Sequence, residues 1–271
     1  MGLAAAFVDV VRILTRNRAL TLEIARRELR GQHAGLLLGR FWGVLQPLFL
    51  MALYAFVFGV VFRVRIGDTV ELPRNYTIYI LSGMVPWLAF VQSMTRGATS
   101  IVDNAPLVKQ TVFNVELLPV ARAAVSVVPL AVGILFVGII TAGYYRALPA
   151  TFLLVPLLVV LQFVAMAGAA FALAAVGTFV RDIREVVQLL SVIGVFVLPI
   201  VYLPSAIPGP FEPLLYLNPF SYVIWAYQDA IYYGRFEHPW AWGAFGVGAF
   251  LLFALGYRLF RKVRPFFGNV L

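Results

Sequence analysis

Few side chains in this sequence could carry out covalent or metal chemistry. There is no cysteine, and the two histidines, His33 and His238, lie far apart. Disulfides, thiolate metal sites and a cysteine nucleophile are therefore excluded, and we interpret both histidines as surface or interfacial residues. The only lysines, Lys109 and Lys262, do not follow a glycine, so the chain lacks the phosphate-binding loop that cradles ATP. We expect no metal or cofactor on this chain.

Residues 20–30, which read LTLEIARRELR, have the pattern of an amphipathic helix. One face carries Leu22, Ala25 and Leu29. The opposite face carries Glu23, Arg26, Arg27 and Arg30. Such a helix lies at a membrane interface, where its arginines can bind anionic lipid, a lipid-linked pyrophosphate or a cytoplasmic partner. A plain positive anchor is the other interpretation of this segment.

Residues 101–116 form a second segment that is too polar to span a membrane and too apolar for a free loop. Asp103 or Asn104 can cap a short helix there, and Pro106 suits its first turn. The apolar side chains available for packing are Leu107, Val108, Val112 and Phe113. They could dock into a groove on a cytoplasmic partner, or the helix could simply lie on the membrane.

Aromatic residues make up 15% of the chain. An interfacial aromatic belt explains many of them, but aromatic faces can also pack against the C–H faces of sugar rings without trapping them. A sugar path of this kind would use Trp42, Tyr54, Tyr79, Trp87, Tyr202, Tyr222 and Trp225. The belt and the path remain open alternatives at this point.

The elements that must position these residues are membrane helices, because 62% of the chain is hydrophobic and the mean hydropathy is +0.92. Six apolar segments are candidate spans: 41–62, 76–94, 117–145, 151–180, 186–203 and 240–260. Polar residues and Pro86 dilute the second, so a re-entrant hairpin is an alternative there. Residues 204–239 are rich in proline and predict short helices broken by turns on the outer side. We expect one all-α integral membrane domain over 1–271, with residues 1–40 cytoplasmic or interfacial.

The charge pattern predicts the orientation of these spans. With the N-terminus in the cytoplasm, 16 of the 21 cations fall on the cytoplasmic side, so the positive-inside rule places both termini there. Arg181 and Asp182 lie in the turn after the fourth span. The net charge of +9 suits either nucleic acid or an anionic membrane surface, and the high hydropathy favours the membrane. Almost no ionisable residue lies inside the spans, which disfavours ion-coupled transport.

Taken in order, these segments resemble the permease subunits of type-2 ABC exporters, in the bacterial branch that exports O-antigen, capsule or teichoic acid chains. GLLLGRFWGVLQPLFLMALYAFVFGVVF resembles the start and first span of the family, and SGMVPWLAF its second span. NAPLVKQTVFNVELLP resembles the coupling segment, and VRDIREVVQLLSVIGVFVLPIVY and LNPF follow in the order of the family. The resemblance covers roughly residues 20–271.

This resemblance implies a homodimer in the bacterial inner membrane that works with two copies of a cytoplasmic ATPase, which binds ATP and Mg²⁺. The substrate would be a polymer on undecaprenyl pyrophosphate or another lipid anchor, with its anionic head met by Arg26, Arg27 or Arg30. Broken helices within 204–239 would form an outer gate. The residues that would couple the chain to the ATPase are Asp103, Asn104, Leu107, Val108, Lys109, Arg181 and Asp182.

Two alternatives remain beside polysaccharide export. A type-2 ABC exporter of lipids or drugs would have the same segments, but an aromatic path favours sugars. A membrane enzyme acting on lipid-linked sugars is the other alternative. The predicted spans lack the paired acidic residues that would bind Mg²⁺ or act as a general base, so the sequence favours transport.

Overall fold

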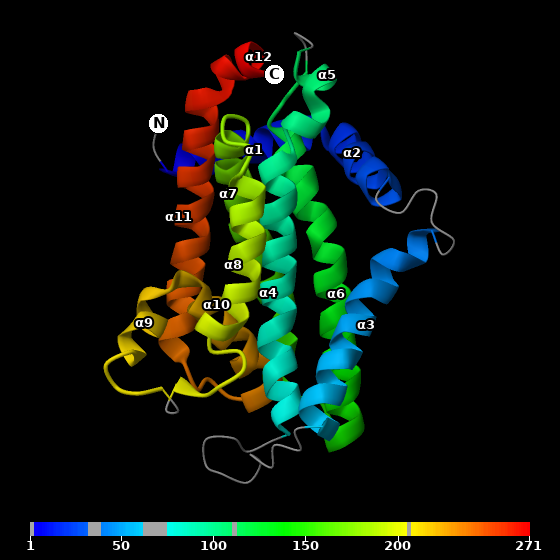
Figure 1. Cartoon of the computed structure of the whole chain (residues 1–271), viewed down its shortest axis with the longest axis vertical. Coiled ribbons are helices and arrows are strands. Elements are labelled where there is room, and N and C mark those ends of the chain that lie inside the picture. The colour runs from blue at the N-terminus through cyan, green and yellow to red at the C-terminus, as the bar shows by residue number, and fades with distance from the viewer. Residues whose placement is uncertain (1–2, 32–38, 62–74, 110–112, 205–206) are drawn as a thin grey trace.

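A computed structural model describes residues 3–31, 39–61, 75–109, 113–204 and 207–271 (Figure 1). Within these ranges the chain forms helices and turns and no strand, which confirms the all-α prediction. His33 lies outside the described residues. The long helices run side by side, and shorter helices cover both ends of the bundle (Figure 1).

Four helical segments of the described chain are long and apolar enough to cross a membrane. They are α4 (Tyr76–Thr99), α6 (Leu117–Tyr145), α7 (Val155–Gly177, after the short helix η4, Ala150–Leu154) and α11 (Pro239–Val263, followed by η7, Arg264–Phe266, and α12, Phe267–Val270). Each matches one of the predicted spans. Helix α6 begins and ends at the predicted residues.

The two remaining predicted spans form shorter helices. Helix α3 (Trp42–Phe56) continues into the π-helical turn η2 (Val57–Val61), within the predicted span 41–62. Helix α8 (Ile183–Val197) has 15 residues, whereas a perpendicular crossing needs roughly 20. The predicted end at residue 203 is wrong, because Leu198 adopts an extended conformation before Pro199.

Helix α4 is one continuous helix, so the re-entrant alternative is wrong. The polar residues that dilute its hydropathy face other helices rather than lipid, and Ser82 and Ser93 are fully buried. Pro86 lies inside the helix, and Gln162 Nε2 of α7 donates to the Pro86 carbonyl at 2.9 Å, so a polar side chain of the neighbouring helix packs against this part of α4. The polar composition of this segment therefore reflects packing inside the bundle.

Helices α7 and α11 approach closely at two glycines. A Cβ atom on Gly256 would lie 2.1 Å from the carbonyl oxygen of Gly168, and one on Gly168 would lie 2.5 Å from the backbone of Phe253. Small residues are a common way for membrane helices to pack, because they bring the two backbones together.

We predict that Gly256→Ala lowers the stability of the bundle by about 1–3 kcal/mol, because the obstructing atoms belong to the backbone and the helices must separate. Thermal unfolding in detergent would measure this loss. Gly248→Ala, on the same helix with nothing near its Cβ position, is the matched control and should be neutral or slightly stabilising. Equal midpoints for both variants would contradict the close approach.

Two helices precede α3, where the sequence predicted only one. Helix α1 (Leu3–Arg16) comes before α2 (Arg18–Gly31), and η1 (Gly39–Phe41) leads into α3. Phe7 of α1 packs edge-on against Phe250 and Phe253 of α11, with ring centroids 5.7 and 5.5 Å apart. The N-terminal segment thus begins against the last long helix and continues, through α2, toward α6.

The short helices gather at the two ends of the bundle. Helices α1, α2, α5 (Ala105–Val108, after η3, Val102–Asn104) and α12 lie toward one end, which we name the basic end (Figure 1). Helices α9 (Glu212–Leu217) and α10 (Pro219–Gln228) and the π-helical turn η6 (Asp229–Tyr233) lie toward the other, the aromatic end. The broken helices predicted for 204–239 are therefore present. Helix α10 is largely buried beside α4 and α11.

Candidate functional site

The predicted coupling segment forms a tight turn at the basic end. Asn104 precedes α5 but does not cap it; its Nδ2 donates to the Ser100 carbonyl at 2.9 Å instead. Pro106 lies in the first turn, as predicted. Leu107 and Val108 are half-buried and Lys109 is exposed. Of the two apolar side chains, Val108 packs against the core of the bundle itself.

Charged contacts join this segment to α2. Arg27 donates from a guanidinium nitrogen to Asn104 Oδ1 at 3.1 Å. Arg122 of α6 pairs with Glu28 at 2.8 Å and with Asp103 at 3.1 Å. The structure therefore brings together one of the three arginines of the amphipathic helix and two of the predicted coupling residues. These contacts connect the predicted coupling turn to α2.

Arg122 holds this network together, and sequence reasoning missed it. Its side chain is only 12% exposed, and it lies near the start of an otherwise apolar span. Its position could have revealed it in the sequence, because an arginine inside a membrane helix is costly unless it is paired. Arg96 and Arg184 line the same cleft beside Glu28, Asp103 and Arg122. The cleft therefore carries three arginines and two carboxylates.

Within the described residues, Arg26 and Arg30 form no ion pair with this network. Both are exposed and line a shallow depression along α2 with Leu22 and Glu23. Leu22 is 55% exposed, so the apolar face of α2 is only partly covered by the bundle. Arg27 is exposed and lines this depression too, so all three arginines are placed to meet an anion from outside the chain.

Arg181 and Asp182 lie in the exposed turn between α7 and α8. Neither belongs to an ion pair within the described ranges. The turn lies beside the end of α4, because a Cβ atom on Gly177 would be 2.1 Å from the Ala98 carbonyl oxygen. Both residues are therefore at the basic end, available to a partner.

The C-terminal segment packs against the same end. Arg264 pairs with Glu116 at 2.5 Å, and the Glu116 side chain is 4% exposed just before α6. Phe267 is buried and packs against Phe260 and Phe179. The tail is thus fixed next to the chain that follows the coupling segment.

Two of the predicted path aromatics lie in the interior between α4, α8 and α10. Tyr79 donates its hydroxyl to the carbonyl of Tyr202 at 3.1 Å. Trp87 donates Nε1–H to the Ser191 carbonyl at 3.2 Å, and its ring covers Gly194 of α8. Both side chains are almost fully buried within one chain, so they position these helices in this structure.

At the aromatic end, Trp225 is fully buried and stacks on His238, with centroids 5.3 Å apart. His238 has a 17% exposed side chain and donates its backbone N–H to Asp229 at 2.9 Å. Its ring Nδ1 and Trp242 Nε1 also contact the Asp229 carboxylate, at 2.9 and 3.1 Å. Asp229 is completely buried and was not singled out by sequence reasoning.

The other predicted path aromatics are half-buried. They are Trp42, Tyr54, Tyr202 and Tyr222. Tyr54 stacks on Phe58 with centroids 6.3 Å apart, and Tyr222 donates its hydroxyl to the Tyr216 carbonyl. Nothing in a single chain brings all seven aromatics onto one surface, and the sugar path stays a prediction. Among the described residues no His, Cys, Asp and Glu cluster could hold a metal ion.

Comparison with known proteins finds a family and relatives that this chain resembles in sequence. Residues 20–232 match the family described as ABC-2 type transporter. The chain is 26% identical to the O-antigen export system permease protein RfbA of Klebsiella pneumoniae over 260 residues, which cover 93% of this chain and 95% of that protein. It is 27% identical to the protein of the same name from Myxococcus xanthus, covering 84% of this chain and 86% of that protein.

Proposed function

The chain belongs to the ABC-2 type transporter family, and from this premise we propose that it forms the membrane channel of an ATP-driven exporter of lipid-linked polysaccharide. It is the permease component of a transporter, with several long apolar helices in the membrane. The ATPase is not in this domain, which agrees with the lack of a phosphate-binding loop. Membership of a transporter family sets aside the alternative of a membrane enzyme.

The observation that carries the choice of substrate is the similarity to O-antigen export permeases over nearly the whole chain. The substrate would be an O-antigen or similar glycan on undecaprenyl pyrophosphate or another lipid. Exposed arginines of α2, Arg26 and Arg30, are suited to its anionic head, because guanidinium groups form strong hydrogen bonds to phosphate. Half-buried aromatics such as Tyr54 could contact its sugars.

Coupling to the ATPase would use the turn from Asp103 to Lys109, with Arg181 and Asp182 beside it. The ATPase would move this turn, and the pairs Arg122–Glu28 and Arg27–Asn104 would carry the movement to α2. Two copies of the ATPase, holding ATP and Mg²⁺, would bind two copies of this chain.

Apolar surface on α3 and α8 is available either to lipid or to a second copy of the chain, and the proposal assigns it to a homodimer. Phe49 of α3 is 73% exposed, and Leu189 and Phe196 of α8 are 61% and 68% exposed. Helix α8 contacts its own bundle mainly through the α4 side, where Trp87 meets Gly194. A second copy of the chain would cover these faces and enclose a channel between the two protomers.

The proposed topology has six crossings, with α3 and α8 as the first and fifth, and both termini in the cytoplasm of a bacterial inner membrane. Because the chain has no cysteine, single cysteines can report each side. Arg181→Cys should react with a membrane-impermeant maleimide only in inverted vesicles, and Gly209→Cys only in intact spheroplasts. Labelling of both positions from one side would contradict this topology.

The function is tested by purifying the chain with and without its partner ABC ATPase, in the presence or absence of a lipid-linked glycan. We expect ATP hydrolysis only by the complex, a change in its rate with glycan, and glycan transport into inverted vesicles. A drug or phospholipid that stimulates hydrolysis while glycan has no effect would favour the other type-2 exporters. Hydrolysis by the isolated chain would overturn the proposal.

A further inference from the structure

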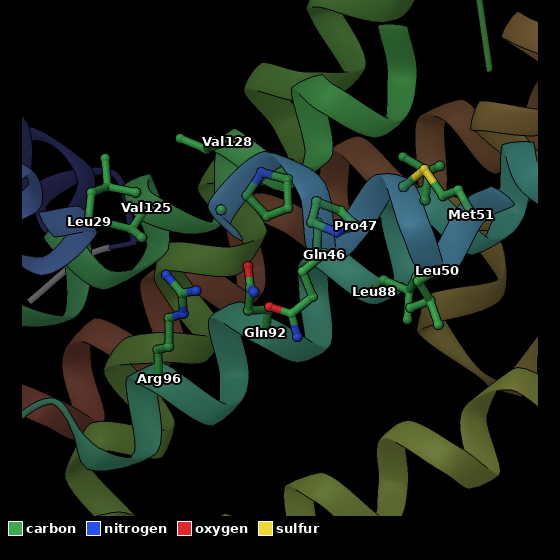
Figure 2. Close-up of a pocket in the computed structure, with 14 residues that line it drawn as sticks. Leu29, Gln46, Pro47, Leu50, Met51, Leu88, Gln92, Arg96, Val125 and Val128 are labelled. Carbon is green, nitrogen blue, oxygen red and sulfur yellow. The ribbon is translucent and has the colours of Figure 1, made fainter. Parts of the chain in front are cut away.

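A cavity of about 170 Å³ lies where α2, α3, α4 and α6 meet near the basic end (Figure 2). One water molecule needs roughly 10–15 Å³ of such space, and a cavity of roughly 150 Å³ can hold benzene. The space is therefore sufficient for a small organic group. It is separate from the depression lined by Arg26 and Arg30, and the coupling residues do not line it.

One part of the cavity wall is polar. Gln92 and Arg96 lie one turn apart on the same face of α4, and Gln46 of α3 reaches toward them from the opposite side (Figure 2). The Oε1 atom of Gln92 is buried and has no hydrogen-bond partner among the described residues. Because buried polar atoms are nearly always paired in folded proteins, this acceptor is open to a donor from water or from a ligand.

The remaining wall is apolar and runs deeper into the bundle. It includes Leu50 and Met51 of α3, Leu88 of α4 and Val128 of α6. Along α4 the lining extends from Arg96 to Val85, which is about 16 Å at 1.5 Å per residue. Phe49, elsewhere on α3, is apolar and exposed. A ligand here would have a polar head and an apolar chain.

The chemistry of the head follows from the polar groups. A guanidinium group and carboxamide N–H groups donate, and they suit the oxygens of a phosphate. The unpaired Gln92 oxygen accepts, so it suits a hydroxyl group on the same ligand. We propose that this cavity binds one lipid whose headgroup is a phosphate ester of a polyol, with the phosphate at Arg96, a hydroxyl at Gln92 and the chain along α3.

Two lipids share this chemistry, phosphatidylglycerol of the bilayer and a lipid-linked glycan. The second would make the cavity a binding site for the exported substrate, and that assignment rests on the proposed function. The binding site itself does not, since bilayer lipid would occupy it whatever the chain exports.

The test is native mass spectrometry of the purified chain, titrated with phosphatidylglycerol and with phosphatidylcholine of the same acyl chains. We expect phosphatidylglycerol to bind about tenfold more tightly, and Arg96→Gln to remove about tenfold of its affinity. Gln46→Leu should weaken it about threefold; because Gln46 is exposed on α3, this variant probes the site without disturbing the core. The matched control is Arg258→Gln, at an exposed arginine of α11, which should bind like the unaltered chain.

Equal binding of the two lipids, or unchanged phosphatidylglycerol binding in both Arg96→Gln and Gln46→Leu, would overturn the proposal. A lipid-linked glycan that displaces phosphatidylglycerol from the unaltered chain but not from Arg96→Gln would identify the substrate as a second ligand of this site. If the unaltered chain with its ATPase does not transport glycan but still binds phosphatidylglycerol in an Arg96-dependent way, the proposed function is wrong and the lipid site is retained.

Discussion

Leu107→Asp is expected to reduce glycan export at least about tenfold while the partner ATPase continues to hydrolyse ATP. Leu107 is half-buried in α5 and, unlike Val108, is not packed against the core, so it remains available to a partner. A charge buried at a docked apolar contact costs several kcal/mol, and about 1.4 kcal/mol already weakens binding tenfold. Transport into inverted vesicles and phosphate release would be measured on the same preparation. This prediction rests on the proposed function.

The matched control is Leu148→Asp, which makes the same chemical change at an exposed leucine between α6 and η4. We expect it to leave export unchanged. Val108→Asp is a poorer probe, because its loss of export would include damage to the bundle. Full export by Leu107→Asp would remove α5 from the coupling surface, and the exposed turn at Arg181 and Asp182 would become the next segment to test.

Hydropathy predicted the long helices well, because each is bounded by residues that end an apolar run. Glu116 and Arg146 bound α6, for example, and its predicted limits were correct. Helix α8 was predicted too long because Pro199 lies within an apolar stretch, and hydropathy alone does not register the lost backbone donor. Helix α1 was missed because its 14 residues are too few to span a membrane, and the contact of Phe7 with α11 forms only in the folded bundle.

The candidate site was predictable only in part. Residue types and turn signals indicated the short helix α5 and the basic face of α2, which are local features. The pairs that join them were not predictable, because Glu28, Asp103 and Arg122 are distant in sequence and meet only in the folded bundle. The burial of Tyr79 and Trp87 was not predictable either, because aromatic residues occur in cores, in interfacial belts and in binding paths alike.

Asp229→Ala is expected to destabilise the aromatic end by about 3–5 kcal/mol, because it removes a fully buried carboxylate from its partners. The backbone N–H of His238 and Nε1–H of Trp242 would lose their acceptor, and the His238 ring would lose its contact. These contacts fix the turn η6 to the start of α11. For a chain of this size the loss corresponds to a fall of about 10 °C in the thermal unfolding midpoint.

Two further variants distinguish the effect of the buried carboxylate on stability from the effect of a surface charge at the same end. Asp229→Asn keeps one oxygen acceptor, so its loss should be smaller, about 1–3 kcal/mol. Glu237→Ala removes a carboxylate that pairs with Arg235 at 2.7 Å, where the side chains are 40% and 60% exposed, and should cost less than about 1 kcal/mol. If Asp229→Ala unfolds at the same temperature as Glu237→Ala, the carboxylate does not hold η6 against α11, and the stacked Trp225 and His238 rings must do so instead.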